Sequence, residues 1–116
     1  MDRVWTREAD VQLAVSRSGQ RCVVGIPGPR LDAAVAAEFK RELVELIDTG
    51  AAAILLDFSA VEFIDSSGLG AVVGAYKHLG PRGRLKICCL RPAVGKVFTL
   101  TRMDRVFTIH DAVPAL

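Results

Sequence analysis

The sequence predicts a single α/β domain: a mixed sheet of about five strands, the first pair antiparallel and the remainder parallel, packed with three main helices and a short C-terminal helical turn. Short apolar runs bounded by Gly, Pro and polar residues alternate with segments of helical periodicity. Two strand-like runs come first, with only a turn between them. At 116 residues the chain fits one domain. We expect residues 1–9 to form an N-terminal extension and residues 10–116 to form the domain.

The first two strands are predicted as a hairpin. Apolar and polar side chains alternate over residues 11–16, as they do in a half-buried strand. Residues 18–20 have the composition of a turn, and residues 22–26 form the returning apolar strand.

A helix and a buried strand are expected next. Apolar residues keep helical spacing over residues 33–48, with Asp32 placed as the N-cap and Gly50 ending the helix. Residues 53–56 form a continuous apolar run that is too short for a helix. Such a run is typical of a central parallel strand covered on both faces.

The second helix is predicted to begin near Ser66 or Ser67 and to end at about Leu79. Its spacing places one apolar stripe toward the core. The stripe consists of Leu69, Val72, Val73 and Tyr76.

Three elements complete the chain after a turn. We expect a strand over residues 85–90, a helix over residues 92–101 and a strand over residues 106–109. Pro92 suits the first turn of its helix because its missing N–H is not needed there. Residues 111–116 leave room for about one helical turn.

Composition and charge exclude several classes of partner. Hydrophobic residues make up 51% and charged residues 24% of the chain, and the formal net charge is +2. Because the basic residues are scattered, we expect neither nucleic acid nor a membrane surface as a partner. No apolar run approaches the roughly 18 residues of a membrane span, and the N-terminus lacks the apolar core of a secretory signal. A cytoplasmic protein is expected.

The three cysteines, Cys22, Cys88 and Cys89, lack the spacing of a CxxC motif and lie in apolar strand-like stretches. We therefore expect small core residues. A small enzyme or redox protein that uses Cys88 and Cys89 is an alternative.

The segment 65–68, Asp-Ser-Ser-Gly, places hydroxyl groups at a predicted helix N-terminus. Backbone N–H groups lack intrahelical partners there and the helix dipole is positive, so an anion is stabilised, including a phosphate on the serine itself. Ser66 is therefore either a helix cap or the site of a switch. Ser67 is expected to cap or fill the first turn. Asp65 is expected to bond N–H groups of the loop, with a role in placing Ser66 for a kinase as the alternative.

One face of this helix carries Gly70 and Gly74 in line with Ser66. A glycine inside a helix costs roughly 1 kcal/mol relative to alanine, so a packing or binding role should offset that cost. Two explanations stay open. The helix packs closely against a neighbour inside the fold, or the glycines leave a smooth exposed surface that lets a partner's backbone approach Ser66.

Other chemistries have little support in the sequence. Asp57 and Asp65 lack a histidine or a further carboxylate at supporting spacing, so no metal site is expected. Residues 68–70 lack the later glycine and lysine of a phosphate-binding loop, and the chain has no Gly-x-Ser-x-Gly elbow. We expect no catalytic residue and no cofactor.

Residues 56–70, Leu-Asp-Phe-Ser-Ala-Val-Glu-Phe-Ile-Asp-Ser-Ser-Gly-Leu-Gly, resemble the signature of bacterial anti-sigma factor antagonists, which belong to the STAS domains. Residues 30–32 (Arg-Leu-Asp) before the first helix resemble the family pattern. Residues 76–77, residues 85–94 and Phe98 after the signature also match it. The resemblance covers residues 10–110, and the order of elements agrees with the one predicted above.

The resemblance implies a switch at Ser66, the first serine of the motif. In the family this serine is phosphorylated by the anti-sigma factor, which is itself a serine kinase and binds the ATP. The unphosphorylated antagonist binds the anti-sigma factor, which then releases its sigma factor, and a serine phosphatase restores that state. A STAS module that scaffolds a larger complex or transporter, with Ser66 purely structural, is the alternative.

The resemblance and the glycine face together predict a partner-binding surface at the start of the second helix and in the nearby loop. We expect the protein to be a monomer or weak dimer. The expected surface comprises Asp32, Asp65, Ser66, Ser67, Gly70 and Gly74.

Overall fold

The computed structural model describes residues 12–114 and contains a five-stranded sheet with the order β1-β2-β4-β6-β7. β1 pairs antiparallel with β2, and the other neighbours pair parallel, which confirms the predicted fold class. The strands are β1 (Ala14–Ser18), β2 (Arg21–Gly25), β4 (Ala53–Asp57), β6 (Arg84–Cys88) and β7 (Ile109–His110).

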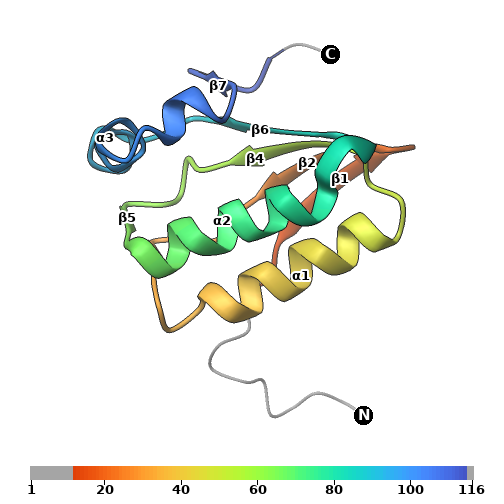
Figure 1. The fold of residues 1–116 in the computed structure, drawn as a ribbon, viewed down its shortest axis with the longest axis horizontal. Helices are drawn as coiled ribbons and strands as arrows, with labels where there is room; N and C mark the ends of the chain where they lie inside the picture. Colours follow the sequence, from red (N-terminus) through yellow and green to blue (C-terminus); the bar gives the residue numbers. More distant parts are fainter. Residues whose placement is uncertain (1–11, 115–116) are drawn as a thin grey trace.

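Three α-helices of the described residues accompany this sheet. α1 and α2 lie side by side and cover one of its faces, while α3 lies beyond the end of the sheet near β5 (Figure 1). The helices are α1 (Ala36–Asp48), α2 (Ser66–Leu79) and α3 (Pro92–Leu100), and two short 3₁₀ turns are η1 (Gly80–Arg82) and η2 (Met103–Arg105). None of the helices in residues 12–114 is long and apolar enough to cross a membrane.

The hydrophobic core lies between the helices and one face of the sheet. Side chains alternate along each strand, so every second residue faces the helices. β4 is the exception expected for a central strand, since three successive residues within it are buried. Fully buried core side chains include Val24, Leu56 and Ile87 from the sheet and Phe39, Leu43, Val72 and Phe98 from the helices.

A second sheet of two short strands, β3 (Arg30–Leu31) and β5 (Phe63–Ile64), was not predicted. Two-residue strands are too short for any periodicity to identify them. The Pro29 carbonyl accepts hydrogen bonds from the N–H groups of Glu62 and Phe63, which extends the pairing by one residue. This small sheet holds the segment before α1 against the segment that leads into α2.

The predicted first strand is wrong in position and in burial. β1 begins at Ala14, and all five of its residues are exposed, because it is the edge strand and lies outside the cover of α1 and α2. Val15, expected to face the core, is 44% exposed. Leu13 does pack against the core, while residue 11 lies outside the described residues.

α1 begins three residues later than predicted, and Asp32 is not its N-cap. The Asp32 carbonyl accepts hydrogen bonds from Val35 and Ala36, and its carboxylate accepts one from Ala34. These bonds close a turn over residues 33–35, and Val35 is the residue that precedes the helix.

Two details of the last third of the chain also differ from the prediction. Val106 is exposed and belongs to the turn after η2, and the last strand is β7 instead of residues 106–109. Residues 111–114 contain no helical turn, and residues 115–116 lie outside the described residues. In α2, Tyr76 is 37% exposed and stacks edge-to-face on Phe107, while Ala71 and Ala75 complete the buried stripe.

Candidate functional site: the start of helix α2

A carboxylate, and neither of the two serines, caps α2. Asp65 is the N-cap residue, and its Oδ1 accepts a hydrogen bond of 2.9 Å from the Gly68 N–H. Its Oδ2 accepts a second bond of 3.2 Å from Ala33. Asp65 therefore fixes the first turn of α2 and also ties it to the loop that contains Asp32.

Ser66 and Ser67 are the first two residues of α2, and both are exposed. Within residues 12–114 neither hydroxyl makes a hydrogen bond, and the backbone N–H groups of the same two residues also lack a partner. Of the two roles expected for Ser67, capping is wrong because Asp65 is the N-cap, whereas Ser67 does lie in the first turn of α2. Two hydroxyls and two N–H donors thus face solvent at the positive end of the helix dipole.

The three glycines of α2 have three different surroundings. A Cβ on Gly68 would collide with the backbone carbonyl of Leu31, so the contact between α2 and β3 requires glycine there. A Cβ on Gly74 would lie 2.8 Å from Cε of Lys40 on α1, whereas one on Gly70 would meet nothing within 4 Å. Of the two explanations left open, close packing therefore applies to Gly74 and the smooth exposed surface to Gly70.

Two charged side chains and one aromatic side chain lie together on and beside the small sheet of β3 and β5. The Arg30 guanidinium donates a hydrogen bond of 2.9 Å to Asp32 and lies 4.1 Å above the ring centre of Phe63. The hydrogen bond from Arg30 lowers the pKa of Asp32 below its ordinary value. Phe63 keeps 39% of its surface exposed. Sequence reasoning missed Arg30 and Phe63, although an aromatic residue directly before the buried Ile64 was a usable signal.

The cysteines divide between the two faces of the sheet. Cys22 and Cys88 are both buried, as expected, Cys22 in the helix-covered core and Cys88 on the other face of the sheet, whereas Cys89 is only half-buried. Asp57, considered above with Asp65, lies instead beside Cys88 and Cys89. Burial, with the neighbouring Cys89 and Asp57, raises the pKa of Cys88 to about 12. That direction is opposite to the lowered pKa of a redox-active thiol, which argues against a redox role.

A hollow lined by several basic side chains lies elsewhere. It has a volume of about 500 Å³ and lies over the face of the sheet opposite α1 and α2. Its lining combines basic side chains, among them Arg17, Arg84 and Lys86, with apolar ones such as Leu55. Ser66 does not line it, so this hollow is separate from the start of α2.

Comparisons with known proteins place the chain in a family. The family model of the STAS domain matches residues 12–115. An anti-sigma F factor antagonist from Paenibacillus polymyxa is 30% identical over 59 residues, which cover half of each chain. A protein of Thermotoga maritima, named as a candidate anti-sigma factor antagonist, is 31% identical over 93 residues that cover 78% of this chain and 82% of the relative.

The solved structures show the same fold. A candidate anti-sigma factor antagonist from Thermotoga maritima, with a crystal structure at 1.59 Å resolution, superposes with a TM-score of 0.80 at 26% identity. The match covers 87% of each chain. The family model covers nearly all of the described residues, and the fold matches that of a similar solved structure: the chain belongs to the STAS-domain family, alongside proteins named as anti-sigma factor antagonists.

Proposed function

We propose that this protein is an anti-sigma factor antagonist whose complex with an anti-sigma factor is switched off by phosphorylation of Ser66. The observation that carries the proposal is the state of the Ser66 side chain. It is exposed at the first position of α2, and the Asp65 carboxylate performs the capping that a serine would otherwise perform. The hydroxyl is therefore available to a kinase without loss of a structural hydrogen bond.

The proposed contact surface surrounds this hydroxyl. It combines the exposed start of α2 with the loop that Asp65 ties to it through Ala33. Phe63 adds an exposed aromatic ring beside the same loop. The surface comprises Asp32, Asp65, Ser66, Ser67 and Gly70, with Phe63 added and the half-buried Gly74 at its far edge.

A phosphate on Ser66 would affect the fold and the complex differently. Within the domain the helix N-terminus stabilises an anion by typically about 0.3–1 kcal/mol, so the fold tolerates the group. At the interface the phosphate adds nearly two negative charges and considerable bulk to a surface fitted to a hydroxyl. The complex dissociates while the domain stays folded.

The proposed partners follow from this switch. The anti-sigma factor supplies the kinase active site and binds the ATP, and a serine phosphatase removes the phosphate. This chain is a substrate of the anti-sigma factor kinase and of the phosphatase, and it is also the protein that the anti-sigma factor binds. Its described residues contribute a docking surface and an acceptor hydroxyl to the transfer.

Phosphorylation is tested with two matched variants. The protein, Ser66→Ala and Ser67→Ala are each incubated with the candidate anti-sigma factor kinase and ATP, and the phosphate is located by mass spectrometry. We expect one phosphate on the wild type and on Ser67→Ala, and none on Ser66→Ala. Stoichiometric phosphorylation of Ser66→Ala would remove Ser66 as the acceptor.

Binding is tested with the corresponding charged variants. Ser66→Glu and Ser67→Glu add the same charge to adjacent exposed positions, and calorimetry measures their affinity for the anti-sigma factor. We expect the larger loss for Ser66→Glu, and full loss for the wild type once it is phosphorylated. An unchanged affinity after stoichiometric phosphorylation would contradict the switch and favour a STAS module that acts only as a scaffold.

A further inference from the structure

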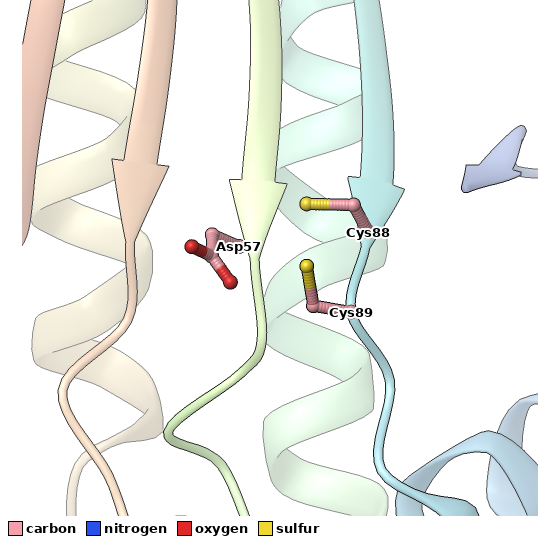
Figure 2. Close-up of side chains that lie close together, drawn as sticks. All are labelled: Asp57, Cys88 and Cys89. Carbon is pink, nitrogen blue, oxygen red and sulfur yellow. The ribbon is translucent and has the colours of Figure 1, made fainter. Parts of the chain in front are cut away.

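Three metal-ligating side chains meet at the end of the sheet where the parallel strands β4 and β6 finish. Asp57 is the last residue of β4, Cys88 is the last residue of β6, and the two are partners in register. With Cys89 they place one carboxylate oxygen and two sulfur atoms within 4.8 Å of one another (Figure 2). The carboxyl ends of parallel strands are the edge at which α/β proteins commonly bind ligands.

The backbone at Cys89 is what brings the two sulfur atoms together. Successive side chains of a strand point to opposite faces, so Cys88 and Cys89 should diverge. Cys89 instead adopts φ = 66°, in the left-handed region that residues other than glycine rarely occupy and that stores strain. Figure 2 shows both sulfur atoms on the same side of the chain, turned toward the Asp57 carboxylate.

We propose that Asp57, Cys88 and Cys89 bind a thiophilic divalent cation, with zinc as the best fit. The set offers two sulfur donors and one carboxylate oxygen, and zinc accepts both kinds of ligand in tetrahedral sites. Two thiolates at about 2.3 Å from a tetrahedral zinc lie about 3.8 Å apart, so small side-chain rotations bring the three donors into range. The fourth position is left to water or to a further ligand.

Proton release accompanies the binding step. Two S–H bonds break, two metal–sulfur bonds form, and two protons pass to the solvent. Without a cation, burial and the nearby anionic groups raise the pKa of Cys88. A divalent cation compensates these charges and deprotonates the thiols that coordinate it.

The surroundings hold the donors in place. Oδ1 of Asp57 accepts a hydrogen bond of 2.8 Å from the Ser59 N–H, which orients the carboxylate and leaves Oδ2 for a metal. The Cys88 carbonyl accepts a bond of 3.0 Å from Phe58, so the chain just beyond β4 is fastened to the end of β6. Asp57 and Cys89 are half-buried, which leaves a path from the solvent.

A buried nitrogen lies on β7, the strand that neighbours β6. His110 is the register partner of Cys88 on β7, and its Nε2 is buried with no hydrogen-bond partner among the described residues. Buried polar atoms are usually paired, and an unpaired one calls for a bound water or ion. This observation is independent of the thiol geometry and points to the same end of the sheet.

Cobalt titration of the full, reduced chain tests the proposal, because cobalt bound to thiolates absorbs light in a characteristic way. We expect thiolate-to-cobalt charge-transfer absorption and the visible bands of tetrahedral cobalt, both removed by an equivalent of zinc. Cys22→Ala and Cys88→Ala form a matched pair, since each deletes one buried thiol, on opposite faces of the sheet. The absorption should persist in Cys22→Ala and disappear in Cys88→Ala.

A second pair of variants keeps the test decisive if Cys88→Ala unfolds. Asp57→Asn and Cys89→Ser alter half-buried positions, and we expect each to weaken zinc binding more than about tenfold in competition with a chromophoric chelator. Zinc should raise the unfolding temperature of the wild type and of Cys22→Ala more than that of Asp57→Asn or Cys89→Ser. The proposal is overturned if the wild type shows no thiolate-to-cobalt absorption, or if Asp57→Asn and Cys89→Ser both bind zinc as the wild type does.

Discussion

The Asp65 carboxylate accepts a hydrogen bond of 2.9 Å from the Gly68 N–H, and this bond sets where α2 begins. The other carboxylate oxygen accepts a hydrogen bond from the Ala33 N–H, and the Asp65 N–H donates one to the Leu31 carbonyl. One residue thus joins the second helix to the segment around β3. Ser66 follows Asp65 directly and does not cap the helix. Helix capping and the proposed phosphorylation therefore belong to two different residues.

Asp65→Ala and Ser66→Ala should therefore differ in stability. Loss of an N-cap carboxylate costs about 0.5–2 kcal/mol, and loss of the bond to Ala33 adds to that cost. Ser66→Ala changes an exposed side chain and should stay within about 0.5 kcal/mol of the wild type. Urea denaturation of both variants measures the difference. Equal losses would show that the serine hydroxyl shares the capping role.

The same substitution at two positions of α2 should shift stability in opposite directions. Gly70→Ala adds a methyl group in open space and should stabilise the helix by about 0.5–1 kcal/mol. Gly68→Ala forces a methyl group into the Leu31 carbonyl and should destabilise by about 1–3 kcal/mol or more.

Thermal unfolding followed by circular dichroism ranks these two variants against the wild type. The order expected is Gly70→Ala, wild type, Gly68→Ala, from the highest midpoint to the lowest. A Gly68→Ala protein as stable as the wild type would mean that α2 can move away from β3 without cost.

The order of elements could be predicted because each long element carries its own pattern. The apolar run of β4 and the helical spacing of α1 are local signals, and both elements are present. β3 and β5 have two residues each and exist only because they pair with one another, so no local pattern marks them. The exposure of β1 also escaped prediction, since its position at the edge follows from the whole topology.

The candidate site was predicted only in part for similar reasons. A helix N-terminus at the Asp-Ser-Ser-Gly segment follows from the sequence, and the selection of Ser66 as the modified residue stays a prediction. The meeting of Asp57 with Cys88 depends on the register of β4 and β6, which are far apart in the chain. The direction of the Cys89 side chain depends on the left-handed backbone conformation of that residue. The neighbouring residues in the sequence do not predict this conformation.

The ion pair between Arg30 and Asp32 should show in the pH dependence of stability. The hydrogen bond from Arg30 lowers the pKa of Asp32 in the folded state, so its stabilising contribution is present above the unfolded pKa of about 3.9. That contribution is lost as the pH falls through the lower folded pKa. Carbon NMR titration of the Asp32 carboxyl should give a higher pKa in Arg30→Gln than in the wild type.

Arg41→Gln is the matched control for this titration. Arg41 pairs with Glu38 and Glu45 on α1, so its removal should leave the titration of Asp32 unchanged. An Asp32 pKa that does not move in Arg30→Gln would assign the shift to the bond from Ala34 instead.

Phe63 should contribute strongly to the affinity of the proposed complex, although only part of its side chain is exposed. Aromatic side chains at the centre of an interface often dominate binding, and this ring lies on the small β3–β5 sheet directly before α2, with the Arg30 guanidinium against one side. Phe63→Ala should therefore weaken binding to the anti-sigma factor by at least about tenfold, corresponding to roughly 1.4 kcal/mol.

Val15→Ala provides the comparison, because Val15 is similarly exposed but lies on the edge strand β1. Calorimetric titration of both variants with the unphosphorylated partner distinguishes a local hot spot from a general effect of removing exposed apolar surface. Because Phe63 is 39% exposed, its removal should leave the folded domain intact by circular dichroism. Equal affinities for the two variants would move the centre of the contact away from β5 and toward the exposed face of α2 around Gly70.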